Sequence, residues 1–304
     1  MDLFFLISSG VKIAVITFGI ILPMVALCSL AERKVSAFIQ DRIGPNRVGL
    51  PMTLLGAKKD IPFFGLVQPL ADGLKFILKE DFTPKHVNKF YFWLAPALVL
   101  VPALLTVGVI PVLMIFGELN LGTIVRFQDQ NGWLLLPLWG HGLSLQRWLL
   151  LLPLLISFII FTVSIFAETN RAPFDLPECE TELVAGYHTE YSSMKFALFF
   201  LGEYAAMIVG SALIVTLFLG GWSIPFGDKL GLGYQAAQNS AWIGLLHLGC
   251  FLTKVIAFIF FFMWVRWTLP RFRYDQLMRL GWIFFFEIAL FNVFLTAGIL
   301  MLVK

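Results

Sequence analysis

The chain has 304 residues, of which 59% are hydrophobic and 13% are charged, about half the roughly 25% charged share of soluble domains. Its mean hydropathy is +0.85, so it carries more apolar surface than a soluble fold covers. The net charge of +3 is too small to indicate nucleic-acid binding. The composition therefore predicts an integral membrane protein that binds no nucleic acid.

Six apolar segments reach the length of about 20 residues that a membrane-spanning helix needs. Their continuous, non-alternating pattern favours helices over strands. We predict spans at Val11–Ala31, Tyr91–Phe116, Trp148–Ala167, Phe196–Gly220, Ala241–Val265 and Trp282–Val303. The expected fold is an all-α polytopic helical bundle that forms a single transmembrane domain over residues 1–304.

Positive charge is distributed very unevenly among the loops between these spans. Sixteen Lys and Arg residues fall in the loops 32–90, 168–195 and 266–281, which we call the three basic loops, and three fall in the other two loops. Because basic loops stay on the inner side of a membrane, we expect the three basic loops to face the cytoplasm or the mitochondrial matrix. We expect the bacterial inner membrane rather than the mitochondrial one, with the basic loops in the cytoplasm and both chain ends outside.

The first basic loop contains an amphipathic piece at Pro69–Glu80. Its two faces consist of Leu70, Leu74, Ile77 and Leu78 on one side and of Asp72, Lys75 and Lys79 on the other. This pattern predicts a short helix that lies in the membrane interface. The alternative is a basic loop that merely touches anionic lipid.

The second basic loop holds six of the nineteen carboxylates within 23 residues: Glu168, Asp175, Glu178, Glu180, Glu182 and Glu190. On a helix, Asp175, Glu178 and Glu182 would form one stripe. Packed carboxylates at low dielectric cannot all ionise, so such a cluster can hold and pass protons. The alternative is a solvated acidic face in which Asp175 caps a helix.

Three charged residues, Glu203, Lys254 and Glu287, lie inside predicted spans. Each costs at least ~2.5–3.5 kcal/mol in lipid, so each is expected to face the bundle interior or water. Glu203 would extend the acidic loop inward, and Lys254 would continue a polar path. We interpret Glu287, early in the last span, as structural.

The chain offers few ligands for a redox centre. Cys28, Cys179 and Cys250 are far apart and have no metal-binding spacing. His247 is the one histidine in a predicted span, whereas haem ligation between spans needs a pair. We therefore expect no cofactor or metal bound in this chain, and any redox chemistry must come from a partner or a diffusible substrate.

The basic loops resemble one family over long, ordered motifs. These are Glu32-Arg-Lys-Val, Asp41-Arg-Ile-Gly-Pro-Asn-Arg-Val-Gly, Gln68-Pro-Leu-Ala-Asp-Gly-Leu-Lys, Ala167-Glu-Thr-Asn-Arg-Ala-Pro-Phe-Asp-Leu-Pro-Glu-Cys-Glu-Thr-Glu, and Trp267-Thr-Leu-Pro-Arg-Phe-Arg-Tyr-Asp-Gln-Leu-Met. The family is the membrane subunit of respiratory complex I beside the quinone cavity, which is the H-type subunit of NADH-quinone oxidoreductase or NADH dehydrogenase subunit 1. The resemblance runs from the first span to the last.

The resemblance implies a non-redox subunit of a proton-pumping NADH:quinone oxidoreductase. It implies that quinone is the substrate and that the quinone chamber or its entrance is lined by Arg33, Arg42, Asp72, Arg171, Phe174 and Asp175. It further implies a proton path that begins with Glu178, Glu180, Glu182, Glu190 and Glu203. The implied partners are the other complex I membrane subunits, the iron–sulfur and quinone-site subunits of the peripheral arm, which hold FMN and iron–sulfur clusters, and the lipid bilayer.

The sequence departs from the family in three places. The family usually has eight spans, and a helical pair with a Tyr-Glu carboxylate is missing here after the second span. Leu50–Gly65 looks like an insertion, and Ile283 and Glu287 stand where the family often has Lys and Pro. Two other functions stay open on the residues alone: the membrane anchor of a related ion-pumping hydrogenase complex, and a free-standing proton-coupled transporter.

Overall fold

The computed structural model describes residues 11, 14–50, 61–107, 120–135, 145–176, 186–227, 230–233 and 240–302. Within these residues, six helices are long and apolar enough to cross a bilayer. They are Ala14–Ile39, Lys89–Thr106, Trp148–Glu168, Ser193–Phe218, Ala241–Thr268 and Tyr274–Leu302. Each overlaps one predicted span, so the prediction of a polytopic helical membrane protein is confirmed.

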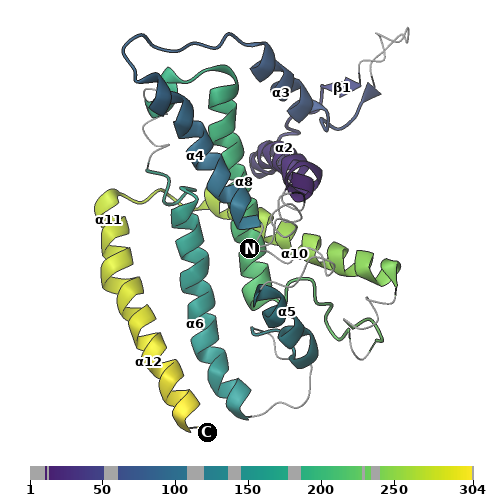
Figure 1. Cartoon of the computed structure of the whole chain (residues 1–304), viewed down its shortest axis with the longest axis vertical. Helices are drawn as coiled ribbons and strands as arrows, with labels where there is room; N and C mark the ends of the chain where they lie inside the picture. Colours follow the sequence, from purple (N-terminus) through teal and green to yellow (C-terminus); the bar gives the residue numbers. More distant parts are fainter. Residues whose placement is uncertain are drawn as a thin grey trace. The chain divides into compact units, whose positions relative to one another are not determined.

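Figure 1 shows the elements in chain order. They are η1 (Thr17–Ile21), α2 (Leu22–Ile39), β1 (Gly49–Leu50), β2 (Ile61–Pro62), α3 (Gln68–Leu78), α4 (Lys89–Val107), α5 (Asn120–Asn131), α6 (Leu145–Glu168), η5 (Gly186–Glu190), α8 (Ser193–Phe218), α10 (Ala241–Thr268), α11 (Tyr274–Arg279), η6 (Leu280–Phe285) and α12 (Phe286–Leu302). The predicted amphipathic helix of the first basic loop is confirmed as α3.

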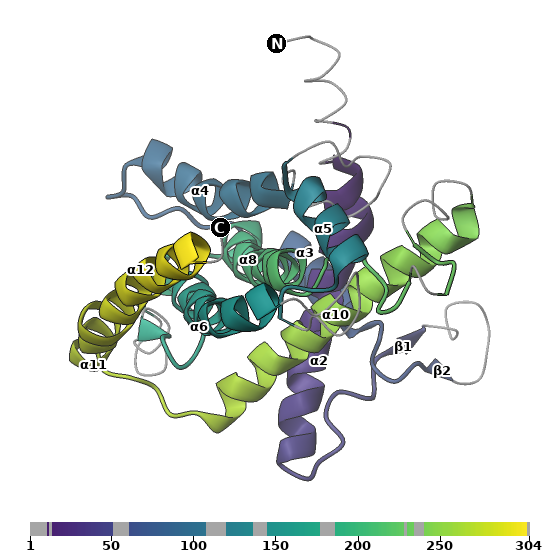
Figure 2. The same ribbon diagram turned by 90° about the horizontal axis from the view of Figure 1, so that it is seen from below.

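A two-residue antiparallel hairpin, β1 with β2, follows α2 in the chain and lies to its side (Figure 2). Gly49 is opposite Pro62 and Leu50 is opposite Ile61. Leu50 of β1 and all of β2 belong to Leu50–Gly65, the segment that we interpret as an insertion, whose residues 51–60 lie outside the described part of the chain. The hairpin is too short to change the fold class.

Several helices extend beyond the ends predicted for them. The helix of the first span runs to Ile39, past Ala31, and α10 runs to Thr268. The sequence argument ended both spans at the first charged residue, but Glu32 and Arg266 form an ion pair with each other. Because the pair satisfies both charges, the helices can continue through them.

The third basic loop is correspondingly shorter than predicted. The last helix begins at Tyr274, where the Arg273 backbone N–H donates to the Gln276 side chain (3.0 Å). A glutamine three residues into a helix that bonds back in this way marks a helix start. For the second span, α4 is described as far as Val107, and residues 108–119 lie outside the described part.

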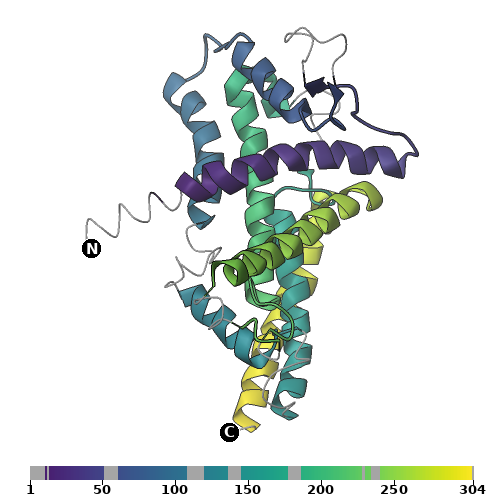
Figure 3. The same cartoon turned by 90° about the vertical axis from the view of Figure 1, so that its right-hand side faces the viewer.

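The chain divides into two compact units. The first unit consists of Met1–Val107, Pro177–Ile208 and Phe261–Leu269. Within it, α3 lies beside α2 (Figure 3), where Arg33 pairs with Asp72. The helices α4 and α8 also approach closely, because a Cβ on Gly202 would lie 2.8 Å from Val99 Cγ1.

The second unit consists of Gly108–Leu176, Val209–Phe260 and Pro270–Lys304. Within it, α12 runs alongside α6 (Figure 1). Asn292 on α12 donates to the Pro153 carbonyl (3.0 Å) and to Ser157 Oγ (2.8 Å) on α6. A buried amide that bonds across two apolar helices fixes their register, since an unpaired amide in lipid is costly.

Candidate functional site

Asp72, a predicted quinone-binding residue, is held on α3 by three side chains. Arg33 Nη1 on α2 lies 3.0 Å from Asp72 Oδ2, and Gln68 Nε2 donates to Asp72 Oδ1 at 3.0 Å. Lys75 Nζ lies 3.7 Å from the same Oδ1. The structure therefore brings the predicted residues Arg33 and Asp72 together. Arg42 is exposed in the loop after α2, and its Nε donates to Gln40 (2.8 Å).

The apolar face of α3 points outward. Leu70, Leu74, Ile77 and Leu78 are exposed, whereas Asp72 on the other face bonds to α2. An exposed apolar stripe opposite a bonded polar face suits a helix in the membrane interface. Its place in the membrane stays a prediction.

A buried carboxylate that the sequence argument missed lies one residue before Arg33. Glu32 is 5% exposed, and it bonds to Arg266 near the end of α10 and to the Tyr204 hydroxyl on α8. The predicted span ended at Ala31, so Glu32 was counted as a loop residue. The signal that could have identified it is its position one residue after a long apolar run.

Of the five predicted proton-path residues, Glu190 and Glu203 lie in the described part of the chain. Glu203 is half-buried on α8, directly before Tyr204, and Glu190 is exposed at the end of η5. The predicted residues Glu178, Glu180 and Glu182 lie outside the described part. Next to Glu190, burial raises the pKa of Tyr191 above its usual range, and the negative charge of Glu190 raises it further.

The first and second basic loops are bonded to each other in the first unit. Ser192 Oγ accepts from the Phe82 N–H (2.9 Å), and Ser193 Oγ donates to the Phe76 carbonyl (2.8 Å). Lys195 is buried, lies 3.0 Å from Asp81 and stands over the Trp93 ring at 4.3 Å. These contacts bring the first and second basic loops directly together.

The second and third basic loops are bonded to each other in the second unit. Asp175 is 2% exposed, and its Oδ2 lies 3.2 Å from Arg271 Nη2. The Phe272 N–H donates to the Pro173 carbonyl (3.0 Å), and the Phe272 ring stacks on Phe174. The predicted quinone residues Phe174 and Asp175 are thus packed against the third loop. Arg171, also buried, belongs to the same unit.

Lys254, predicted to continue a polar path, is bonded to the backbone just after α8. Its ammonium group donates to the carbonyls of Leu219, Gly221 and Ser223 at 2.8–2.9 Å, and it lies 3.9 Å from the Trp133 ring centroid. An ammonium has three hydrogens, and three carbonyls accept them here. Lys254 therefore stabilises the turn that follows α8.

The chain after α8 is held by two further side chains of the second unit. His247 bonds through its two ring nitrogens to the carbonyls of Trp222 (2.9 Å) and Leu232 (2.8 Å). Gln128 on α5 donates to the Thr216 and Leu217 carbonyls and accepts from the Gly220 N–H. Gly220 has φ +69°, and a Cβ there would lie 2.3 Å from the Trp133 ring, so glycine is required.

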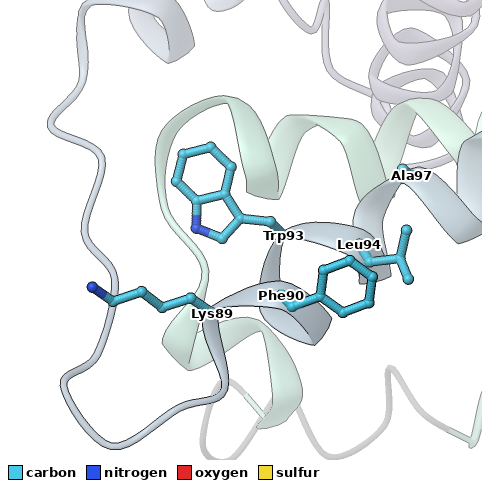
Figure 4. A pocket seen from close by; sticks show the side chains of 5 residues that line it. All are labelled: Lys89, Phe90, Trp93, Leu94 and Ala97. Carbon is cyan, nitrogen blue, oxygen red and sulfur yellow. The ribbon is translucent and has the colours of Figure 1, made fainter.

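A hollow of about 440 Å³ lies on α4 and is lined by Lys89, Phe90, Trp93, Leu94 and Ala97 (Figure 4). The predicted quinone-binding residues do not line it. Within the described residues, no group of three or more His, Cys, Asp and Glu side chains could hold a metal ion.

Comparison with known proteins decides the family. A sequence model of the family described as NADH dehydrogenase matches residues 11–114 and 109–297. The chain belongs to this family. It is 37% identical to the H-type subunit of NADH-quinone oxidoreductase from Flavobacterium psychrophilum, over all of both chains. It is 39% identical to that of Salinibacter ruber (96% of this chain, 97% of the relative) and 40% to one from Geobacter sulfurreducens (97% of each).

Membership of the NADH dehydrogenase family makes the chain a membrane subunit of an oxidoreductase complex, whose other subunits are its partners. The three named relatives are bacterial NADH-quinone oxidoreductase subunits. The comparisons therefore do not favour the hydrogenase anchor or the free-standing transporter.

The alignment with one relative also shows that this chain lacks residues within the aligned region. The alignment with the Flavobacterium psychrophilum protein has 361 positions, 57 more than the 304 residues of this chain. The two segments that match the family model meet and overlap at residues 109–114. Fifty-seven positions suffice for two spans of about 20 residues with their connections. The absence of a helical pair after the second span stays a prediction.

Proposed function

We propose that this chain forms the quinone-binding chamber of a proton-pumping NADH:quinone oxidoreductase, together with the peripheral arm, and the first part of its proton path. Quinone is the substrate, and its electrons come from FMN and iron–sulfur clusters in partner subunits. The partners are the other membrane subunits of complex I and the iron–sulfur and quinone-site subunits of the peripheral arm. This chain supplies no redox group.

The observation that carries this proposal is that each basic loop is bonded to the other two through charged side chains. Lys195 with Asp81 joins the first loop to the second, Arg271 with Asp175 joins the second to the third, and Arg266 with Glu32 joins the third to the first. A quinone needs an apolar slot for its tail and polar contacts for its headgroup. In this proposal the apolar spans provide the first and the paired charges at their ends provide the second.

The residue types also match the chemistry of quinone reduction. Two electrons and two protons convert a quinone to a quinol, so the headgroup needs donors of protons or hydrogen bonds nearby. Asp72 supplies a carboxylate paired with the Arg33 cation at α3, and Glu203 supplies a titratable group inside α8. A carboxylate near the headgroup can therefore respond when quinone demands protons.

The sidedness of the loops completes the proposal. The excess of Lys and Arg in the three basic loops places them in the cytoplasm of a bacterial cell under the positive-inside rule. The bonds among the loops support a common side for all three. The peripheral arm would then dock from the cytoplasm.

Cysteine labelling tests this orientation. Leu230 and Lys85 are both exposed and lie on opposite sides in the proposed topology. We expect Leu230→Cys to react with an impermeant maleimide in intact cells. Lys85→Cys should react only in inverted vesicles, after the soluble subunits are stripped with chaotropic salt. The parent chain, with buried Cys28, gives the background, and the reverse labelling pattern would overturn the orientation.

Asp72→Asn tests the quinone site. Removal of the charge that Arg33 and Lys75 contact should raise the KM for a short-chain quinone roughly tenfold, equivalent to about 1.4 kcal/mol. Assembly should stay normal, because Asp72 lies near the surface. Glu80→Gln, an exposed acid just after α3, is the matched control. Unchanged quinone kinetics in fully assembled Asp72→Asn complex would contradict the assignment.

A further inference from the structure

The last membrane helix buries little of its surface within this chain. It packs on α6 (Figure 1), and among its residues Phe286–Leu302 Asn292 alone is buried. Asn292 bonds to the Pro153 carbonyl and to Ser157 Oγ on α6. The side of α12 that carries Asn292 therefore faces α6, and most of the remaining surface is open to lipid or to another protein.

Glu287 lies on the opposite side of the same helix. It precedes Asn292 by five residues, which turns it about 140° around the helix axis, away from α6. Its side chain is exposed. Leu290, Phe291 and Phe294 are also exposed, and they share the side of Glu287 because they follow it at helical spacings. We call Glu287 and these three residues the outer face of α12.

The depth of Glu287 makes its exposure to lipid costly. Pro153 and Ser157 are the ninth and thirteenth of the 24 residues of α6, so Asn292 bonds near the middle of that span. Glu287 lies about 8 Å from this level along the helix axis. A hydrocarbon core of about 30 Å extends about 15 Å from its middle, which places the Glu287 backbone well inside it. Long Lys and Arg side chains reach water from such a depth, but the shorter glutamate does not.

The described part of this chain supplies no counter-charge for Glu287. Among residues 11, 14–50, 61–107, 120–135, 145–176, 186–227, 230–233 and 240–302, none forms a hydrogen bond or an ion pair with its carboxylate. Arg279, the basic residue that precedes it in the same helix, lies about 12 Å away along the axis. A charged side chain inside a membrane is expensive unless it meets a partner. That partner is therefore expected from outside this chain.

We propose that the outer face of α12 is the docking surface for another membrane subunit of the complex, through a helix that carries a Lys or Arg at the depth of Glu287. Membership of the family makes other subunits the partners of this chain. Leu290, Phe291 and Phe294 would pack against that helix, and Glu287 would pair with its cation. The inference goes beyond the proposed function and does not depend on the quinone site.

Charge complementarity favours this occupant over the two others that an apolar helix face admits. Acyl chains cover Leu290, Phe291 and Phe294 well, but they offer no cation to Glu287. A second copy of this chain in a symmetric contact would present the same patch, so that Glu287 would meet another Glu287. Two carboxylates at low dielectric repel each other. A basic residue on a different membrane subunit satisfies both the apolar and the charged part of the face.

Photocrosslinking in native membranes identifies the occupant of the outer face. The photoreactive p-benzoylphenylalanine takes the place of Phe291, so an aromatic side chain stays beside an intact Glu287. We expect an adduct between this chain and another membrane subunit, and mass spectrometry of its peptides should place the link on a helix that contains Lys or Arg. The same label in place of Phe260, an exposed residue of α10, is the control and should not give this adduct.

Glu287→Leu tests the role of the charge. Leucine suits lipid better than glutamate, so a Glu287 that merely faced lipid would give equal or higher amounts of assembled complex in Glu287→Leu. In a docked face the partner's cation is left unpaired, and assembled complex should fall roughly tenfold while the amount of this chain in the membrane stays near that of the parent. Val293→Leu, at an exposed residue outside the outer face, is the matched control and should assemble normally.

An exchange of the two charges completes the test. Glu287→Lys combined with a glutamate in place of the crosslinked cation should restore assembly that Glu287→Lys alone loses. The quinone reductase rate per assembled complex should match that of the parent in every variant, so this inference and the proposed quinone site fail independently.

Three results would overturn the docking surface. They are adducts of the Phe291 label with lipid only, adducts with a second copy or within this chain, and normal assembly of Glu287→Leu. If Glu287→Leu lowered the amount of the chain itself, the crosslink would decide, because it is made with Glu287 in place.

Discussion

Glu203→Gln is expected to lower quinone reduction and proton pumping together, each by roughly tenfold or more. Glutamine keeps the volume and the hydrogen-bonding capacity of the half-buried Glu203 but cannot titrate. In the proposed function electrons and protons meet at one chamber, so loss of the titrating group should slow both. The predicted loss of the Tyr-Glu helix leaves one carboxylate fewer in the path, so we expect little redundancy.

The measurements are the quinone reductase rate and the pH gradient in vesicles that carry equal amounts of assembled complex. Glu203→Asp should retain part of both activities, because it still ionises about one methylene further back. A structural glutamate would show the opposite order, with Gln tolerated and Asp worse. Glu287→Gln, on the exposed side of the last helix, is the matched control. Near-normal rates in Glu203→Gln would remove Glu203 from the path.

The spans could be predicted from the sequence because a run of about 20 apolar residues has few other uses. The ends of the helices could not, because a helix continues past a charged residue whose partner is supplied by a distant part of the chain. Glu32 and Arg266 are 234 residues apart in sequence and pair with each other. Nothing local in either segment indicates that partner, so a span boundary placed at the first charge falls short.

The same limit applies to the candidate site. Asp72 and Asp175 could be selected from their motifs, but their cations Arg33 and Arg271 are paired with them only by the tertiary structure. Lys254 shows the limit most clearly. Its position in a span suggested a polar path, whereas its ligands are three backbone carbonyls. Their orientation depends on the positive φ angles of Gly220 and Gly221.

Lys254→Met is expected to have the largest effect on stability. The Leu219, Gly221 and Ser223 carbonyls would lose the donors they now have, at ~1–3 kcal/mol for each group left unpaired. The contact with the Trp133 ring would also lose its charge. Release of a half-buried ammonium from its desolvation offsets part of this. A net loss of about 3 kcal/mol in the free energy of unfolding follows.

The expected place of the damage gives a direct measurement. Without Lys254 the segment after α8 should open first, so limited proteolysis in vesicles should cut between Gly220 and Leu232 at a lower temperature than in the parent. Thr253→Val, which removes only a bond within α10 to the Gly249 carbonyl, is the control and should match the parent. If Lys254→Met resisted cleavage like the parent but pumped fewer protons, Lys254 would belong to the proton path instead.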